Sequence, residues 1–217
     1  MEQSEESQVL KEIIQSILEG SNKRAAIGVQ RALEMDLGPK LILDEGLIAA
    51  MEEVGRRFEN QEFFLPEMLV SASAMKSGLA ELGPSLIEIN AEPVGRVVIG
   101  TVKGDLHDIG KNLVAIMLEG NGFDVIDLGV DVPPEDFVRA VEEHHPDLLG
   151  MSALLTTTMP SIPATMEALS KAGLREKVIV MVGGAPVTQE FANMVGADLF
   201  ATNAASAAAL AKSRVAD

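Results

Sequence analysis

From residue 94 onward, short runs of strand-forming residues alternate with stretches of helical period. In chain order the runs are RVVIGT, FDVIDLG, DLLGMSAL, KVIVMVGG and ADLFAT. A helical stretch follows each run, with predicted starts at Asp108, Pro134, Met159, Thr188 and Asn203. Strand–helix repeats of this kind bury their strands in a parallel sheet that has helices on both faces. The pattern therefore predicts an α/β domain with a five-stranded parallel sheet, of the flavodoxin-like or Rossmann-like class.

The part of the chain before this pattern shows helical period and no strand signal. Helices are predicted at about 9–18, 21–35, 39–58 and 66–82, which together make a four-helix bundle. Ser21 is expected to cap the second helix, and Pro66 suits the first turn of the fourth.

Between the two patterns the segment GPSLIEINAEPVG carries two prolines and two glycines. Such residues interrupt regular structure, so a linker is predicted between Leu82 and Val94. We expect a helical-bundle domain at 1–88 and an α/β domain at 89–217. A hinge is expected in residues 83–93.

The chain is strongly acidic, with 33 Asp and Glu residues against 17 Lys and Arg residues. This balance makes nucleic acid and anionic membrane surfaces poor partners. The absence of cysteine excludes disulfides, thiolate nucleophiles and Cys-ligated metal sites. The first residues lack the features of a signal peptide, and no apolar run approaches membrane-spanning length, so a cytoplasmic location is expected.

Ligands of parallel α/β sheets bind beyond the carboxyl ends of the strands. The loops expected there are 103–110, 152–158 and 183–186. The first loop, within TVKGDLHDIGKNLV, places His107 between Asp105 and Asp108. These polar side chains make the first loop the candidate site.

Several known loop chemistries do not fit this sequence. A Walker-type phosphate loop fails because the gap between Gly104 and Gly110 is too long and Asn112 stands where Ser or Thr would hold magnesium. No GxGxxG follows the first strand, which excludes a dinucleotide fingerprint. A phosphoacceptor receiver domain would need an aspartate where the third strand ends in Ser152.

Two interpretations of the loop remain open from the residues alone. A carboxylate that accepts the N–H of one imidazole nitrogen makes the other nitrogen a better metal ligand or base. Because the loop has a single histidine, a metal there would bring its other ligands with it, as in a macrocycle. Alternatively, Asp105 and Asp108 cap the following helix and His107 is an ordinary loop residue.

The motifs resemble those of cobalamin-binding domains. GDLHDIG matches the D-x-H-x-x-G signature, and SALLTTT and the glycine pair Gly183–Gly184 match two further motifs in order. RRFENQEFFLPEM resembles the cap helices of methyl-transferring cobalamin proteins. From about residue 9 to 212 the chain is similar to the small corrinoid proteins of methanol, methylamine and betaine methyltransferase systems, and to the cobalamin module of methionine synthase.

The resemblance implies a set of site residues. His107 would be the lower axial ligand of cobalt, displacing the cofactor's own base, in the His-on/base-off form. Asp105 would hold the other ring nitrogen, and Thr158 would complete a proton relay. Further cofactor-binding residues would be Asp108, Ile109, Gly110, Ser152, Leu154, Thr156, Gly183 and Gly184, of which the glycines would make room for the displaced nucleotide tail.

The resemblance also places Phe58 and Leu65 over the upper, methyl-bearing face of the corrin. Their alternative role is ordinary packing in the bundle core. One departure from the family pattern lies at ATNAAS, where many relatives carry an acidic residue. Asn203 can still cap the last helix there.

The implied function is that of a methyl carrier that is not catalytic alone. Co(I) would accept a methyl group from a substrate-specific methyltransferase, and methyl-Co(III) would pass it to a second methyltransferase that acts on a thiol or tetrahydrofolate. A reductive activator is a further implied partner. The preferred donor is a methylated amine or betaine, with methanol and aryl methyl ethers as other options.

Three alternatives come from other classes of protein. One is a cobalamin-based sensor or regulator, disfavoured because no DNA-binding segment or output domain is evident in the sequence. Another is the small subunit of an adenosylcobalamin mutase, disfavoured because such subunits lack a helical cap. The third is a flavodoxin-like binding module without a corrinoid.

Overall fold

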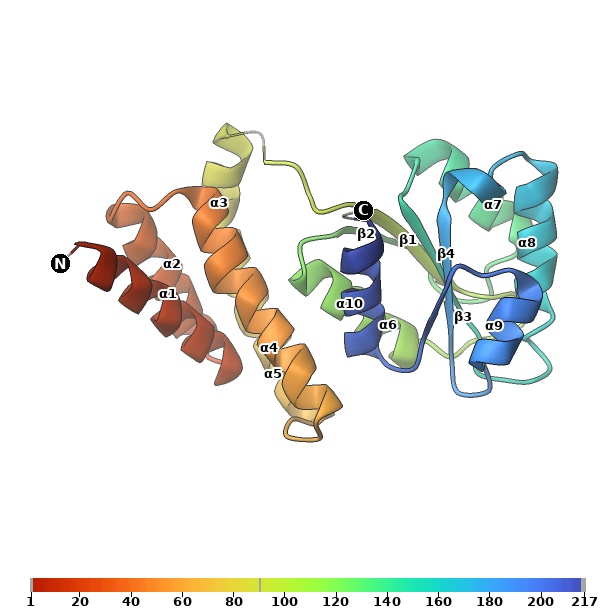
Figure 1. Cartoon of the computed structure of the whole chain (residues 1–217), viewed down its shortest axis with the longest axis horizontal. Coiled ribbons are helices and arrows are strands. Elements are labelled where there is room, and N and C mark those ends of the chain that lie inside the picture. Colours follow the sequence, from red (N-terminus) through yellow and green to blue (C-terminus); the bar gives the residue numbers. More distant parts are fainter. Residues whose placement is uncertain (1, 90, 216–217) are drawn as a thin grey trace. The chain divides into compact units, whose positions relative to one another are not determined.

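The structure is a computed structural model that describes residues 2–89 and 91–215. Two compact units make up the chain, Met1–Glu92 and Pro93–Asp217 (Figure 1). Each unit has a hydrophobic core of its own.

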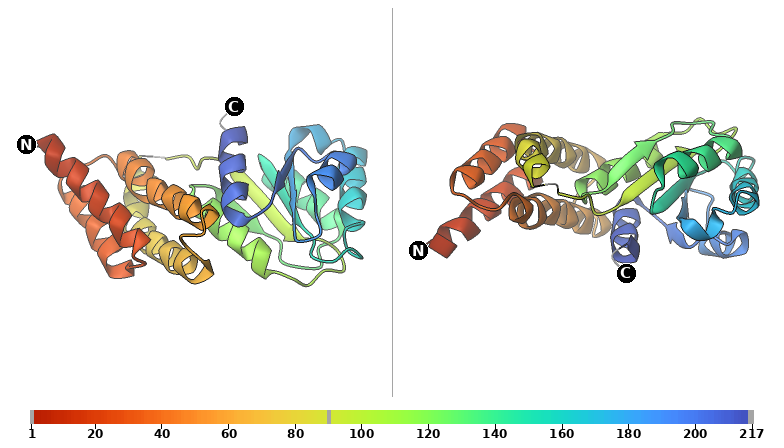
Figure 2. Two further views of the ribbon diagram at one scale, coloured as in Figure 1. Left: turned by 60° about the horizontal axis from the view of Figure 1, so that its bottom comes forward. Right: turned by 90° about the horizontal axis from the view of Figure 1, so that it is seen from above.

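The first unit is helical throughout its regular structure. Its helices are α1 (Glu2–Leu18), α2 (Asn22–Glu34), α3 (Pro39–Leu41), the π-helical η1 (Ile42–Ile48), α4 (Ala49–Glu59) and α5 (Leu65–Glu88). Because α3, η1 and α4 follow one another without a break, they form one long helix. The helices α1, α2, α4 and α5 pack on one another as a bundle (Figure 2). The predicted helical unit is confirmed, and the π-helical middle of its third helix is an addition to the prediction.

The last helix of this unit runs further than predicted. We expected it to end near Leu82, but α5 continues to Glu88 and contains Pro84. A proline forfeits one main-chain hydrogen bond of the helix. This loss does not end α5, whose preceding turns are anchored by the buried Met75 and Leu82. The linker predicted from composition is therefore partly helical.

The second unit alternates strands and helices. Its elements are β1 (Arg96–Thr101), α6 (Ile109–Gly120), β2 (Asp124–Asp127), α7 (Pro134–His144), β3 (Leu148–Ser152), α8 (Ser161–Lys171), the short 3-10 helix η2 (Arg175–Lys177), β4 (Ile179–Gly183), α9 (Gln189–Val195), β5 (Leu199–Ala201) and α10 (Ala204–Val215). All strand pairs are parallel, in the order β2-β1-β3-β4-β5. The predicted five-stranded parallel sheet is confirmed.

The strand order reverses at β1, because β2 lies on one side of it and β3 on the other. Helices α7, α8 and α9 cover one face of the sheet, and α6 and α10 cover the other (Figure 1). Crevices for ligands form where connections leave a strand end in opposite directions. The fold therefore directs attention to the loop that follows β1.

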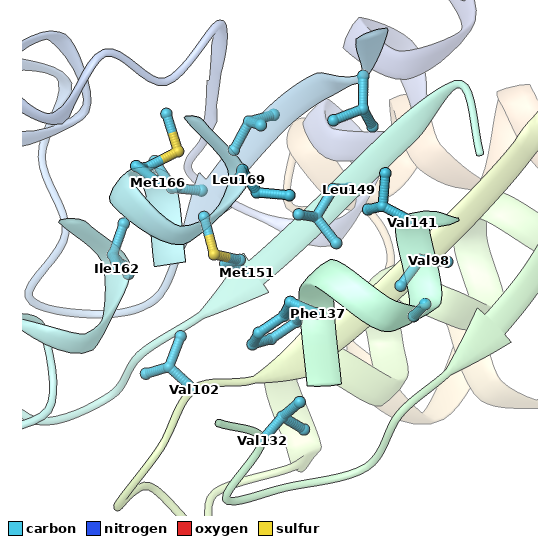
Figure 3. Close-up of a cluster of buried hydrophobic side chains, with 14 of the residues drawn as sticks. Val98, Val102, Val132, Phe137, Val141, Leu149, Met151, Ile162, Met166 and Leu169 are labelled. Carbon is cyan, nitrogen blue, oxygen red and sulfur yellow. The ribbon is translucent and has the colours of Figure 1, made fainter. Parts of the chain in front are cut away.

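The largest side chain of the sheet core is Phe137 of α7, which is fully buried. Figure 3 shows it with its neighbours, among them Val98 of β1 and Leu149 of β3. Gly100 of β1 makes room for the ring, since a Cβ at that position would come within 2.9 Å of it. This packing fixes β1 against α7 and so positions the end of β1.

The hydropathy of the helices bears on membrane insertion. Within residues 2–89 and 91–215, no helix combines the length and apolar character needed to cross a membrane.

Candidate functional site: a carboxylate–histidine pair at the end of the first strand

The loop after β1 brings Asp105 and His107 into direct contact. Oδ1 of Asp105 lies 2.7 Å from Nδ1 of His107 and also accepts the main-chain N–H of His107 at 3.1 Å. The His107 side chain is 51% exposed, whereas that of Asp105 is fully buried. A carboxylate at Nδ1 favours the tautomer with its proton on Nδ1. The imidazole therefore presents Nε2, with a lone pair, at the carboxyl edge of the sheet.

The second oxygen of Asp105 is held by the loop that follows β3. Oδ2 accepts the hydroxyl of Thr158 at 2.7 Å and the main-chain N–H groups of Leu154 and Leu155 at 2.7 and 3.3 Å. Because buried carboxylates need hydrogen-bond donors, these contacts explain how Asp105 can lie inside the protein. The hydroxyl–carboxylate–imidazole arrangement of Thr158, Asp105 and His107 is thus present as expected, while its role toward a metal stays a prediction.

This environment lowers the pKa of Asp105. Burial alone would raise the pKa of the carboxyl, but hydrogen bonds from the Thr158 hydroxyl, the Leu154 N–H and His107 outweigh it and hold the pKa well below its usual range. The side chain is therefore a carboxylate at neutral pH, which suits a partner for an imidazole N–H.

A replacement of Asp105 by asparagine tests this electrostatic assignment. A carboxyl with a depressed pKa stabilises the fold above its unfolded pKa of about 4, and this stability is lost as the pH falls through the folded pKa. We expect the apo wild type to be more stable than Asp105→Asn at neutral pH and the difference to shrink steadily below about pH 4. Urea unfolding at several pH values measures it, with Asp108→Asn as the control for loss of a carboxylate in the same loop. A constant difference across this range would contradict the assignment.

The alternative interpretation, in which both aspartates cap the following helix, is wrong. Asp105 directs its carboxylate to His107 and to the β3 loop. Asp108 occupies the N-cap position of α6, but its side chain makes no capping hydrogen bond. Only its main-chain carbonyl takes part, by accepting the N–H of Asn112 at 2.8 Å.

Exposed apolar side chains lie in three loops of this unit. Leu106 and Ile109 belong to the His107 loop, Leu154 and Leu155 to the loop that binds Asp105, and Val130 to the loop after β2. Leu106 is 71% exposed and Ile109 is 70% exposed. We call this set the apolar rim, which consists of Leu106, Ile109, Val130, Leu154 and Leu155. Large apolar side chains left exposed together on ligand-facing loops indicate a surface that a ligand covers.

The loop after β4 needs glycine at position 184 for a reason internal to the fold. Gly184 has φ +126, and a Cβ there would lie 1.9 Å from the carbonyl oxygen of Ala153. We expected glycine here to admit a nucleotide tail, but close approach of the β3 and β4 loops already requires it. For Gly183 the nearest atom to an added Cβ is the Ala201 carbonyl oxygen, at 3.3 Å.

The other predicted residues vary in exposure. Ser152 is half-buried, and Leu154, Thr156 and Gly110 are exposed on the same edge of the sheet. Phe58 and Leu65 belong to the helical unit, where Phe58 is half-buried and Leu65 is exposed. Their role over a corrin stays a prediction.

At the last helix, Asn203 is a cap as expected. Its Oδ1 accepts the main-chain N–H of Ser206 at 2.8 Å.

Sequence reasoning missed three residues that hold the loop from outside. The Thr101 hydroxyl donates to the His107 carbonyl at 2.9 Å, and the Ser161 hydroxyl donates to the Lys103 carbonyl at 3.0 Å. Asp131 accepts the N–H of Gly104 at 2.7 Å. The Asp131 and Ser161 contacts join positions 27 and 58 residues apart, whereas Thr101 lies only six residues before His107. No sequence motif singled out any of the three.

Two family models match the chain. Both describe a B12 binding domain, one over residues 95–211 and the other over residues 9–82. The first therefore spans the sheet unit with the site, and the second spans the helical unit.

Curated relatives match nearly the whole chain. The dimethylamine corrinoid protein of Methanosarcina barkeri is 43% identical over 206 residues, covering 94% of this chain and 96% of the relative. Trimethylamine corrinoid protein 1 of Methanosarcina acetivorans is 42% identical and covers 87% of this chain and 88% of the relative.

Solved structures agree with these relatives. A chain of the methanol:cobalamin methyltransferase complex from Methanosarcina barkeri superposes with a TM-score of 0.83 at 32% identity, covering 96% of this chain and 80% of that one. A cobalamin-binding protein from Desulfitobacterium hafniense gives 0.81 at 31% identity, covering 94% and 98%. The chain belongs to the B12-binding family and, within it, to the corrinoid proteins of methyltransferase systems.

Proposed function

We propose that this protein carries a methyl group on a bound corrinoid between two methyltransferases, with His107 as the lower axial ligand of cobalt. The observation that carries the proposal is the Asp105–His107 pair at the strand-order reversal of a B12-binding domain. Asp105 holds Nδ1 at 2.7 Å and thereby leaves Nε2 for a metal. No hydrogen bond engages Nε2 within the described part of the chain.

The residues present fit a corrinoid in two respects. The loop offers a single imidazole, which suits a cobalt whose equatorial ligands come from a macrocycle. The apolar rim offers exposed apolar side chains of the kind that such a ring needs for contact. Ser152, Leu154, Thr156 and the Gly183–Gly184 turn are the residues proposed to line a slot for the nucleotide tail.

When bound, the corrinoid supplies the methyl-carrying chemistry through its cobalt. The protein's own residues would hold and orient the imidazole. Asp105 would accept a hydrogen bond from Nδ1–H of His107 and so make Nε2 a better metal ligand. The same carboxylate would hold the ring in place when no metal is bound. Thr158 donates to the same carboxylate and keeps it oriented.

The partners follow from the relatives. Since these carry dimethylamine and trimethylamine in their names, a methylated amine is the proposed donor class, delivered by a substrate-specific methyltransferase. A second methyltransferase to a thiol or tetrahydrofolate and a reductive activator complete the proposed system.

The helical unit is proposed to shield the upper face of the corrin through Phe58 and Leu65. The exposed position of Leu65, beside the exposed Phe64, supports this role. A shield of this kind must move aside for a partner enzyme. Since α5 ends at Glu88 and β1 begins at Arg96, we propose the hinge between these two residues.

Reconstitution with cobinamide, a corrinoid without a nucleotide base, tests the proposal directly. We expect the purified protein to retain cobinamide and hydroxocobalamin after free cofactor is removed. After reduction to the Co(II) state, the electron paramagnetic resonance spectrum should show nitrogen splitting from an axial ligand. Because cobinamide has no base of its own, this nitrogen must come from the protein, and labelling histidine with ¹⁵N should change the splitting. A protein that stays colourless would refute corrinoid binding, and a bound cobinamide without nitrogen splitting would refute ligation by His107.

A further inference from the structure

The loop between β2 and α7 supports the His107 loop through a single residue, Asp131. Oδ1 of Asp131 accepts the main-chain N–H of Gly104 at 2.7 Å, and its own N–H donates to the carbonyl of Asp105 at 2.9 Å. One residue of a neighbouring segment therefore binds two consecutive residues, Gly104 and Asp105, that lie three and two positions before His107.

Asp131 makes these contacts from an unusual backbone conformation. Its φ is +54, in the left-handed region that non-glycine residues seldom occupy. Such a conformation costs about 1–2 kcal/mol for most residues and somewhat less for Asp or Asn. It persists only where surrounding contacts determine it, and such positions cluster at functional sites.

The segment around Asp131 is anchored on both sides. Before it, the Gly129 carbonyl accepts the N–H of Thr101 at 2.9 Å, and after it the N–H of Val132 donates to the Thr101 carbonyl at 3.0 Å. The buried Lys111 of α6 pairs with Asp127, whose Oδ1 accepts the Gly129 N–H at 2.8 Å. Asp131 is thus a fixed point from which the His107 loop can be held.

The supported loop needs such a point because it turns sharply. Gly104 has φ +83, and the N–H of Asp105 donates to the carbonyl of Val102 at 3.1 Å, which closes a tight turn. Without Asp131, the Gly104 N–H would lose its partner and the turn would be held mainly by the contacts of Asp105 and Ser161.

We infer that Asp131 is a positioning residue for the His107 loop, which fixes the Gly104–Asp105 turn and so presents the imidazole in one orientation for metal ligation. The part of this inference that concerns a corrinoid rests on the proposed function. Asp131 acts through the main chain of Gly104 and Asp105. Its function depends on a hydrogen-bond acceptor at this position and little on its charge, because the Lys103–Asp131 pair is exposed and of little energetic value.

Three variants separate these contributions. Asp131→Asn keeps an acceptor oxygen and tolerates the left-handed conformation. Asp131→Gly removes the acceptor, and glycine adopts a positive φ without strain. Any effect of this variant therefore comes from the lost acceptor and not from a strained backbone. Asp36→Gly is the matched control, since Asp36 also has a positive φ, of +59, and lies in the helical unit.

The first measurement uses the protein without cofactor. Amide hydrogen exchange at Gly104 reports directly on the bond to Asp131. We expect exchange about tenfold faster in Asp131→Gly, a rate within about twofold of wild type in Asp131→Asn, and no change in Asp36→Gly. Unchanged protection of Gly104 in Asp131→Gly would overturn the inference, whether or not the protein binds a corrinoid.

The second measurement uses cobinamide. Asp131→Gly should bind it about five- to tenfold more weakly and show broadened nitrogen splitting, and Asp131→Asn should restore both properties. If Gly104 loses protection while cobinamide affinity and splitting match the wild type, the link to metal ligation is overturned. If the wild type binds no cobinamide, the proposed function fails, and the exchange experiment alone then decides whether Asp131 holds the turn.

Discussion

Replacement of His107 by alanine should weaken cobinamide binding by about 100-fold and remove the axial nitrogen signal from the Co(II) spectrum. Loss of a group that hydrogen-bonds a metal ligand costs about 10–100-fold in metal affinity, and loss of the ligand itself should cost at least the upper part of that range. The apolar rim remains in this variant, so we expect cobinamide still to bind weakly, without a nitrogen ligand from the protein.

The fold should tolerate this change. The His107 side chain is half exposed, and its removal leaves Asp105 with its bonds from Thr158, Leu154 and Leu155. We expect His107→Ala to unfold at the same urea concentration as the wild type. If it also loses the nitrogen ligand to cobalt, His107 acts as a ligand and not as a residue that stabilises the fold.

Cobinamide titration and the Co(II) spectrum provide the measurements, with His144→Ala as the matched control. His144 is the last residue of α7, and its main-chain carbonyl accepts a hydrogen bond from the Arg96 side chain. The control should bind cobinamide like the wild type. Nitrogen splitting that survives in His107→Ala would assign the axial ligand elsewhere and remove His107 from the proposal.

The sheet and its site could be predicted because their signals are local in sequence. Alternating runs of strand and helix residues specify a parallel sheet, and the carboxyl ends of its strands specify where ligands bind. Asp105 and His107 are two residues apart, so their contact at 2.7 Å needs only a tight turn. The match to known motifs then indicated Thr158, whose contact with Asp105 joins positions 53 residues apart.

The features that escaped prediction depend on backbone geometry or on distant segments. Asp131 binds Gly104 because the strand order places β2 next to β1 and because the φ of Asp131 is positive. The residues adjacent to Asp131 in the chain predict neither feature. The length of α5 was misjudged because Pro84 is a local signal, whereas the burial of Leu82 is a property of the bundle. Gly184 was singled out for a nucleotide tail, a role that stays a proposal, whereas its close approach to the Ala153 carbonyl was not predicted.

Replacement of Gly184 by alanine should destabilise the protein by about 3 kcal/mol or more. The added methyl group would meet main-chain atoms, with the Ala153 oxygen at 1.9 Å and its carbonyl carbon at 2.8 Å. No rotamer change can relieve a clash with main chain, so the β3 and β4 loops must separate. The φ of +126 adds backbone strain of about 1–3 kcal/mol for a residue with a Cβ.

The consequence should reach Asp105, because Ala153 directly precedes the two N–H groups that bind its Oδ2. Separation of the loops moves Leu154 and Leu155 and weakens their bonds at 2.7 and 3.3 Å. We therefore expect Gly184→Ala to lose cobinamide affinity as well as stability.

Gly196→Ala is the control that isolates backbone strain from overlap. Gly196 also has a positive φ, of +73, but an added Cβ there meets no atom within 4 Å. It should cost only about 1–2 kcal/mol and leave cobinamide affinity unchanged. Urea unfolding followed by circular dichroism compares the two variants. If Gly184→Ala proves no less stable than Gly196→Ala, the β3 and β4 loops are not in the close contact described, and the proposed nucleotide tail is then the remaining reason for glycine at position 184.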